Sequence, residues 1–446
     1  MSTALAALLV AAGAGTAQAD SVRSNQWHLT AMKAEEMWRS STGDGITVAV
    51  IDSGVDTSNP DLQGKILDGR NFAPGESGDE HSDYDGHGTS MAALIAGTGN
   101  SRDGDGAFGL APGVKVLPVR VPEKAANLAE DNEQFNATVS AAIRYSADEG
   151  AQVINISLAA SKGSQKLTDS VKYALGKGSL VFAGMGNDAE RANGVKYPAA
   201  TPGAVGVAAV GRDLQRTEES QYGPHVDLSA PGEEMIHACQ SATNVCTSHG
   251  TSAATALASA SAALIWSKHP DWTNNQVLRV LLNTAGGPTT GEERVDDIGH
   301  GIVRPRIALT NPGDPGPADE YPLPDLAAAG SPEPSAKPSK ATGGSEESDE
   351  PAAAAPATDD KGNTALWIGL GIGAVVLIGA AAAVMTVRSR RRGAARTVPS
   401  PPTYPYQSPH AYQQQPQPPY PSYGPPAGGP GPGAPYGGPP SQGPTT

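Results

Sequence analysis

Runs of β-branched residues alternate with helical patterns between residues 45 and 265, and this alternation constrains the fold more than any other feature. Five short runs have the composition of buried strands and lie at residues 45–51, 114–121, 152–158, 179–183 and 203–210. Four stretches are alanine-rich or periodic as helices are, at residues 90–97, 136–148, 170–175 and 253–265. The alternation predicts an α/β fold with a doubly wound, mainly parallel sheet and helices on both faces.

Three short segments place an acid, a base and a hydroxyl on this frame. Asp52 ends the first predicted strand, His87 lies between two glycines before an alanine-rich helix, and Ser252 opens the helix at 253–265. In open parallel sheets, sites gather beyond the carboxyl ends of the strands. We therefore expect these side chains to meet in one cleft at that edge of the sheet.

These residue types are the ones that a serine nucleophile requires. A serine hydroxyl is a weak nucleophile at neutral pH, and it needs a base within hydrogen-bond reach. His87 is the candidate base, because an imidazole accepts and returns a proton near pH 7. Asp52 is the candidate carboxylate that fixes the tautomer of the imidazole. With Ser252 as nucleophile, the order Asp, His, Ser predicts hydrolysis through an acyl-enzyme.

The negative oxygen that forms during such a reaction needs hydrogen-bond donors. The first N–H groups of the helix that Ser252 opens have no partner within the helix and offer one donor. Asn187 follows the predicted strand at 179–183 and offers its side-chain amide as a second. Asparagine is also a common turn residue, so Asn187 has a structural alternative.

The segments around Asp52, His87 and Ser252 resemble those of the subtilisin-like serine proteases, over residues 44–310. The resemblance implies that these three residues form the catalytic triad and that Asn187 is the oxyanion donor. It also implies that two segments bind the substrate backbone and wall the pocket for the residue before the cut: Ser157, Leu158, Ala159, Gly184, Met185 and Gly186. The family often has glycine where this chain has Ala159, which implies a narrower pocket. Residues 299–303 are similar to the family's closing strand.

Segments outside this domain carry targeting signals. Residues 1–19 have an apolar core and an A-x-A site, which predicts a secretory signal peptide, although no basic residue precedes the core. Residues 364–387 contain an uncharged apolar run long enough to cross a bilayer, and arginines follow it directly. The positive-inside rule then predicts a single-pass protein of the cell membrane, with the catalytic domain outside and the C-terminal tail in the cytoplasm.

Three further segments have no predicted core of their own. Residues 20–43 form an N-terminal arm that is too short for an independently folding inhibitory domain. We expect Trp27, Met37 and Trp38 of this arm to pack on the catalytic domain. The Pro-rich, acidic residues 311–363 predict a disordered linker, and residues 388–446 predict a basic, then Pro-, Tyr- and Gly-rich disordered tail.

Charge and cysteine content limit the partners. A formal net charge of −15 is unsuited to binding nucleic acid. The only two cysteines are Cys239 and Cys246, and an extracytoplasmic location permits a disulfide between them, worth about 2–3 kcal/mol in the chain-entropy model. Two cysteines without a suitably spaced histidine make no zinc site, and no calcium-loop pattern is complete. The sequence therefore predicts no cofactor and no set of metal-ligating residues, while a structural calcium ion stays an open alternative.

The whole layout resembles a narrower group, the mycosins, which are membrane-anchored proteases of type VII secretion systems. The shared features are a signal peptide, one subtilase domain, a Pro-rich linker and a C-terminal span. The resemblance implies a protein or peptide substrate and a type VII secretion complex as partner. Three alternatives stay open: a general cell-surface subtilase, a mainly structural component of a secretion complex, and an esterase that uses the same triad.

Overall fold

Seven parallel strands form the central sheet, in the order β2-β3-β1-β4-β5-β6-β7. The computed structural model describes residues 21–122 and 132–330. The strands of the sheet are β1 (Thr47–Asp52), β2 (Arg70–Asn71), β3 (Lys115–Arg120), β4 (Val153–Ile156), β5 (Leu180–Gly184), β6 (Val205–Val210) and β7 (Leu228–Pro231). The parallel α/β fold predicted from the sequence is confirmed. The strand order changes direction around β1, which is where α/β sheets carry their sites.

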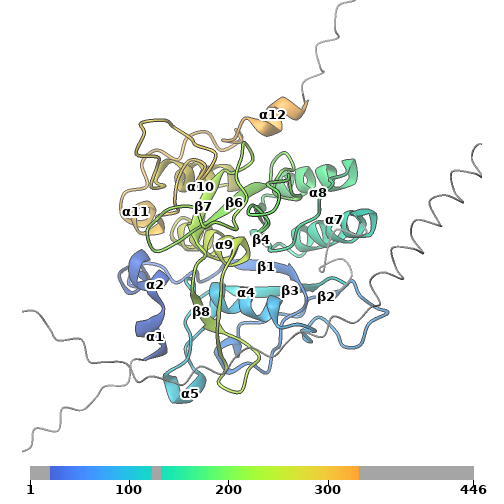
Figure 1. The fold of residues 1–446 in the computed structure, drawn as a ribbon, viewed down its shortest axis with the longest axis vertical. Helices are drawn as coiled ribbons and strands as arrows, with labels where there is room; N and C mark the ends of the chain where they lie inside the picture. Colours follow the sequence, from blue (N-terminus) through green and yellow to red (C-terminus); the bar gives the residue numbers. More distant parts are fainter. Residues whose placement is uncertain (1–20, 123–131, 331–446) are drawn as a thin grey trace, which may run out of the picture. The chain divides into compact units, whose positions relative to one another are not determined.

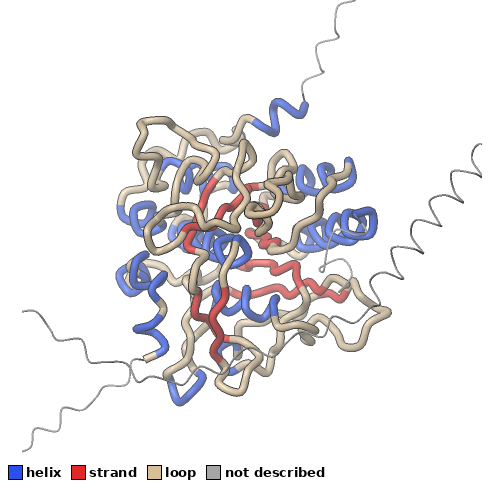
Figure 2. Tube along the Cα trace, in the orientation of Figure 1, coloured by secondary structure: helices blue, strands red, loops and turns tan. Residues whose placement is uncertain are grey.

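Helices cover both faces of this sheet (Figure 1). The helices are α1 (Val22–Asn25), α2 (Trp27–Met32), α3 (Ala34–Trp38), η1 (Pro60–Leu62), α4 (His87–Ala96), α5 (Ser101–Gly104), α7 (Asn132–Asp148), α8 (Gln165–Gly176), α9 (Thr251–Lys268), α10 (Asn274–Asn283), α11 (Pro305–Thr310) and α12 (Asp325–Gly330). Figure 2 shows the strands lying between these helices, which separates the interior into two cores.

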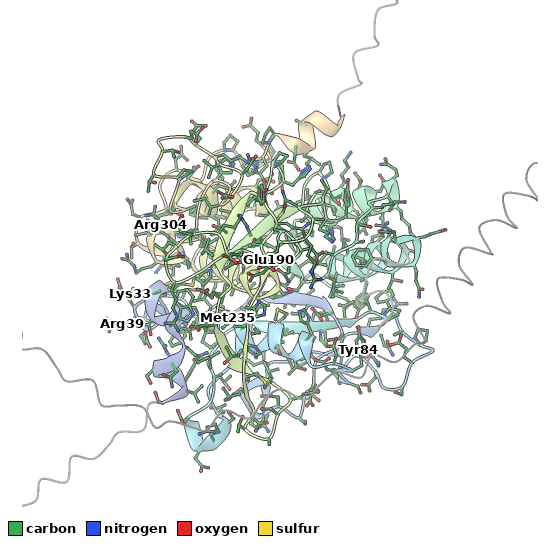
Figure 3. The ribbon with its side chains drawn as sticks, viewed as in Figure 1. Lys33, Arg39, Tyr84, Glu190, Met235 and Arg304 are labelled. Carbon is green, nitrogen blue, oxygen red and sulfur yellow. A yellow bond between two sulfur atoms is a disulfide. The ribbon has the colours of Figure 1, made fainter. Side chains whose placement is uncertain are left out.

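Alternation along each strand sends its side chains to the two cores in turn. In β1, Val48 and Val50 pack with α4 and α9, whereas Ala49 and Ile51 pack with α7 and α8. All four side chains are buried, so the strand reads as a continuous apolar run rather than an alternating one. Side chains fill the space between the sheet and its helices (Figure 3).

Helix α9 runs through the larger core and contacts β1, β4, β5, β6 and β7. Its side chains are small and buried almost all round, as expected for a helix inside a core. Hydroxyls inside it bond to its own backbone: Ser261 Oγ donates to the carbonyl of Leu257 at 2.7 Å. The helix therefore fixes Ser252, in its first turn, relative to the centre of the sheet.

The N-terminal arm packs on the domain as predicted. The indole N–H of Trp27 donates to the carbonyl of Glu233 at 2.8 Å, and that of Trp38 donates to the carbonyl of Leu110 at 2.9 Å. Between these anchors, Leu29 and Met37 are buried in the core that contains α9. The arm is thus part of the folded domain.

Two segments differ from the sequence predictions. Residues 299–303, expected as a closing strand, form isolated bridges instead: Ile302 pairs with Ser229 and Gly286, and Gly299 pairs with Val295. Gly299 and Gly301 have φ of 65° and 137°, which interrupts the extended backbone. The first part of the expected linker is folded against the domain instead. Arg279 donates to the carbonyls of Pro315 and Pro317 at 2.7 and 2.9 Å.

Further along, the docked segment also forms hydrogen bonds to Gly203, just before the start of β6. The hydroxyl of Tyr321 donates to the carbonyl of Gly203 at 2.9 Å, and the carboxylate of Asp325 accepts from the N–H of Gly203 at 2.7 Å. Leu323 is buried in the same core as α9. The Pro-rich, acidic composition of this segment predicted a disordered linker. Composition could not show that a few of its side chains anchor it to the domain.

A two-stranded antiparallel hairpin, β8 (Met235–Ala238) and β9 (Val245–Ser248), stands apart from the main sheet. Cys239 and Cys246 are joined by a disulfide at its end, with their Cα atoms 5.8 Å apart. This is the pairing expected from the sequence.

The signal peptide at 1–19, the span at 364–387 and the tail at 388–446 lie outside the described residues. Within the described ranges, the structure contains no helix with the length and apolarity that a bilayer crossing requires.

Candidate active site

Asp52 and His87 are joined by a hydrogen bond at the carboxyl end of β1. The distance from His87 Nδ1 to Asp52 Oδ1 is 2.8 Å, and Asp52 is only 1% exposed. The same oxygen accepts from the N–H of Ser53 at 2.8 Å, and the Ser53 hydroxyl accepts from the N–H of Gly88 at 2.8 Å. Ser53 therefore ties the carboxylate to the first turn of α4, which carries His87.

Two further carboxylates hold the start of α4. Asp83 accepts from the N–H and the hydroxyl of Thr89 at 2.7 and 2.6 Å, and from the N–H of Gly86 at 2.8 Å. Asp85 accepts from the backbone N–H of His87 at 2.9 Å. Carboxylates at a helix N-terminus satisfy its unpaired N–H groups and complement its dipole. This pairing fixes the position from which the imidazole projects.

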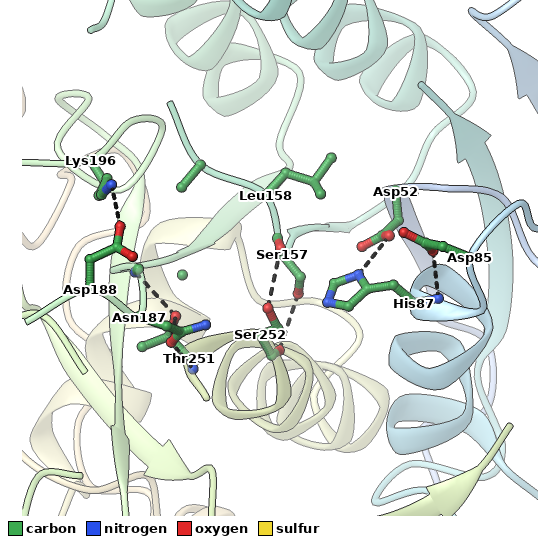
Figure 4. A pocket seen from close by; sticks show the side chains of 13 residues that line it. Asp52, Asp85, His87, Ser157, Leu158, Asn187, Asp188, Lys196, Thr251 and Ser252 are labelled. Atoms are coloured by element: carbon green, nitrogen blue, oxygen red, sulfur yellow. Dashed lines mark hydrogen bonds and ion pairs between the residues drawn. The ribbon is translucent and has the colours of Figure 1, made fainter. Parts of the chain in front are cut away.

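Ser252 lies in the first turn of α9, and its side chain lines the same cleft as Asp52 and His87. Figure 4 shows the imidazole between Asp52 and Ser252, with Nδ1 on the Asp52 side. The Ser252 hydroxyl donates to the carbonyl of Ser157 at 3.3 Å and makes no hydrogen bond to His87. In enzymes without bound substrate such contacts are often long and tighten only in the complex. The three predicted residues are brought together in one cleft.

Asn187 is held so that its amide N–H₂ remains available. Its Oδ1 accepts from the N–H of Thr251 at 2.8 Å and from the Thr251 hydroxyl at 3.0 Å. Gly250 permits this approach: its φ is 112°, and a Cβ there would lie 2.8 Å from Asn187 Nδ2. Asn187 lines the cleft beside Ser252, as an oxyanion donor must.

Five of the six predicted substrate-binding residues line this cleft, which has a volume of about 260 Å³: Ser157, Leu158, Ala159, Gly184 and Gly186. Met185 does not. Its side chain is 3% exposed and packs in the core with α7 and α8. The cause is the alternation at the end of β5, where Gly184 and Gly186 face the cleft and Met185 faces away.

A buried polar chain behind Ser252 was not predicted. Ser259 Oγ donates to Asn155 Oδ1 at 3.0 Å, and Asn155 Nδ2 donates to Ser157 Oγ at 3.1 Å. Ser157 Oγ in turn donates to the carbonyl of Ser252 at 3.1 Å. These bonds join β4 to two turns of α9. The signal in the sequence was an asparagine inside an apolar strand.

Arg120, at the end of β3, was also not predicted. It is 1% exposed and is paired in register with Asp52 on the neighbouring strand. Its guanidinium donates to the carbonyls of Ser77 and Asp79 at 2.8 and 3.2 Å and lies over the ring of Tyr84. Arg120 therefore holds the loop that leads to His87. A charged residue ending an apolar strand was the available signal.

Opposing effects set the pKa of His87. Burial of the ring acts to lower it, but the charge and hydrogen bond of Asp52 act in the opposite direction, and the charges of Asp85 and Asp83 add to them. Together they raise the pKa of His87 to about 9.

In the described part of the chain, no cluster of three or more His, Cys, Asp or Glu side chains is arranged to hold a metal ion.

A parallel sheet whose carboxyl edge brings a buried aspartate, a histidine and a helix-opening serine to one cleft is the architecture of a serine hydrolase. The family comparison agrees with this class. The model of the subtilase family matches residues 43–320, and the chain belongs to that family. It is therefore a subtilisin-like serine-type endopeptidase.

Individual relatives support the assignment. Subtilisin BL from Lederbergia lenta is 34% identical over 247 residues, covering 55% of this chain and 86% of that protein. M-protease from Shouchella clausii is 33% identical, covering 60% of this chain and 66% of that protein.

Solved structures of mycosins are similar to this one. MycP1 from Mycobacterium smegmatis has a TM-score of 0.56 and 27% identity, covering 66% of this chain and 86% of that one. MycP3, described as a protease from the type VII (ESX-3) secretion system, has a TM-score of 0.55 and 32% identity, covering 64% of this chain and 88% of that one.

Proposed function

We propose that this protein is a membrane-anchored extracytoplasmic serine endopeptidase of the mycosin type, associated with a type VII secretion system, and that Asp52, His87 and Ser252 are its triad. The observation that carries the triad is the 2.8 Å contact between His87 Nδ1 and Asp52 Oδ1 in the cleft that Ser252 lines. The likeness to MycP1 and MycP3 supports the link to secretion. The apolar run at 364–387 supports the anchor.

The contacts suggest how peptide hydrolysis proceeds. Ser252 Oγ leaves the carbonyl of Ser157, turns to His87 Nε2 and attacks the peptide carbonyl while the imidazole takes its proton. Asp52 stabilises the imidazolium, which then protonates the leaving amine. The Ser252 N–H and the Asn187 amide hold the oxyanion. In the second half of the reaction, His87 takes a proton from water, and the water attacks the acyl group. The acid product leaves, and the proton returns to Ser252 Oγ.

Replacing Asn187 tests the oxyanion donor. We expect Asn187→Ala and Asn187→Asp each to lower kcat about 10²–10³-fold, because both remove the amide N–H₂. That magnitude was measured on a subtilisin and is carried over from the family. An aspartate at this position still accepts the hydrogen bonds of Thr251, whereas an alanine does not. Comparing the two variants therefore separates hydrogen-bond donation to the oxyanion from the positioning of Thr251. Steady-state peptide hydrolysis gives kcat. Near-normal activity in Asn187→Asp would assign Asn187 to holding Thr251 alone.

The raised pKa of His87 predicts an alkaline activity profile. Only the neutral imidazole accepts the serine proton, so kcat/KM should rise with pH through about 9. Asp85→Asn removes one of the negative charges that favour the imidazolium, so the inflection should move to lower pH. The measurement is the pH dependence of kcat/KM for a peptide.

The control for this shift is Asp169→Asn, on the exposed side of α8, which should leave the inflection in place. An equal shift in both variants would indicate a general charge effect. If the inflection of kcat/KM stays at the same pH in Asp85→Asn, the charge of Asp85 does not raise the pKa of His87.

Two strains test the secretion role. One lacks the gene, and the other carries Ser252→Ala. If proteolysis serves secretion, the Ser252→Ala strain should accumulate uncleaved extracellular proteins, seen by comparing peptide termini in culture filtrates. If the protein is mainly structural, the deletion strain should stop secreting while the Ser252→Ala strain secretes normally. Normal secretion in both strains would favour the general cell-surface subtilase.

Membrane anchoring has a separate test. The full-length protein should stay in the membrane pellet after a carbonate wash and enter solution only with detergent. Recovery in the carbonate supernatant would contradict a spanning segment at 364–387.

A further inference from the structure

One ion pair lines the cleft and has no part in the chemistry described above. Lys196 Nζ donates to Asp188 Oδ2 at 2.7 Å. The lysine side chain is 15% exposed and the aspartate side chain 44%, so the lysine side chain is the more enclosed of the two. Lys196 is half-buried, and its pairing with Asp188 holds its ammonium in one place at the cleft wall.

The pair lies at one end of the cleft, and Asp52 and Asp85 lie at the other (Figure 4). Figure 4 shows Lys196 and Asp188 on one side of Ser252, and His87 with Asp52 and Asp85 on the opposite side. Asp188 directly follows Asn187 in the chain. A side chain that enters between the cleft walls next to Asn187 therefore approaches the ion pair and not the imidazole.

The stem of Lys196 is built into the wall. A Cβ on Gly186 would lie 2.9 Å from Lys196 Cγ, so the stem passes close behind this glycine. The next residue, Tyr197, exchanges two backbone hydrogen bonds with Ala160, at 2.8 and 2.9 Å. These bonds join the segment of Lys196 to the end of the opposite wall, so Lys196 lines the cleft next to the point where the two walls meet.

Lys196 supplies the positive charge at this end of the cleft, and Asp188 supplies a negative charge beside it. Among the described residues that line the cleft, Lys196 is the only lysine or arginine. An ammonium has three N–H donors, and Asp188 accepts one of them. A substrate carboxylate or carboxamide gains a charge-assisted hydrogen bond from such a group, whereas a second ammonium is repelled.

We propose that Lys196, held by Asp188, selects substrates whose residue before the cut carries a carboxylate or carboxamide, and discriminates against lysine and arginine at that position. This inference rests on the proposed function, because it names the substrate class of the same cleft. Asp188 acts as a positioning residue: it orients the ammonium and partly neutralises it, so its removal strengthens the selection.

The test uses peptides that differ only in the residue before the cut, which is Glu, Gln, Ala or Lys. We compare kcat/KM, normalised to the Ala peptide, for wild type, Lys196→Met and Asp188→Asn. Wild type should favour Glu and Gln over Lys by about tenfold, the scale of one charged hydrogen bond. Lys196→Met, which keeps the length of the stem, should abolish that ratio. Asp188→Asn should increase it several-fold.

Lys162→Met, an exposed lysine in the loop after β4, is the matched control and should keep the wild-type ratio. A Glu-to-Lys ratio near one in wild type, or a ratio that both pocket variants leave unchanged, overturns the inference. If Lys196→Met fails to fold, Asp188→Asn alone decides the test. A variant that is merely less stable would not show a higher Glu-to-Lys ratio, so an increase can come only from the changed charge in the cleft. Failure of the proposed function looks different: Ser252-dependent cleavage would be absent for every peptide.

Discussion

Ser252→Ala is expected to lower kcat for peptide hydrolysis about 10⁶-fold and to abolish labelling by a fluorophosphonate probe. The magnitude was measured on a subtilisin and is carried over from the family. The variant removes the attacking oxygen, while Asn187 and the cleft walls stay in place. Folding should be unaffected, because the hydroxyl makes only one hydrogen bond, of 3.3 Å, to Ser157.

The control for this substitution is Ser58→Ala, an exposed serine shortly after β1, which should label and turn over as wild type does. Thermal unfolding of both variants checks that the fold is kept. Equal probe labelling of wild type and Ser252→Ala would remove Ser252 as the nucleophile, and with it the acyl-enzyme mechanism.

Asp52→Asn is expected to lower kcat about 10⁴-fold near neutral pH with little change in substrate binding. This magnitude comes from the corresponding substitution in a serine protease of unrelated fold. The carboxylate accepts from Nδ1 of His87 and so keeps Nε2 free to act as the base. An asparagine that turns its N–H₂ toward Nδ1 holds the wrong tautomer. It also removes the charge that raises the pKa of His87.

Asp56→Asn serves as the control, because Asp56 lies four residues further on and its carboxylate contacts only the N–H of Ser58 among the described hydrogen bonds. It should keep wild-type kcat. The readouts are kcat, KM and the rate of fluorophosphonate labelling, which should fall with kcat in Asp52→Asn. A loss confined to KM would indicate that Asp52 shapes the cleft rather than the base.

The sheet could be predicted because its strands are buried on both faces and so appear as short, continuous β-branched runs. The position of Asp52 followed from the same logic, since a polar residue directly after such a run lies at the carboxyl edge. His87 was marked by its two flanking glycines before an alanine-rich helix. Ser252 was marked by the glycine and threonine before a long alanine-rich helix. In each case the signal is local, so one stretch of sequence carries it.

Contacts between distant segments could not be predicted. Asn155 meets Ser259 across 104 residues, and no local pattern in either segment indicates the other. Lys196 lies in a loop beyond Asn187, and its neighbour Tyr197 pairs with Ala160, at the end of the opposite wall of the cleft. Met185 was misplaced for the opposite reason: its neighbours in sequence line the cleft, but alternation at the end of β5 turns its side chain into the core.

The docking of residues 311–330 has a mechanical consequence. Arg279 and Gly203 fasten this stretch near α10 and the amino end of β6, whereas the reacting side chains stand at the carboxyl ends of the strands. Tension applied to the polypeptide after Gly330 is thus borne by these fastenings, on the side of the sheet away from the scissile bond. We expect a pull from the C-terminal side to act on these hydrogen bonds before it reaches the loops that carry Asp52 and His87.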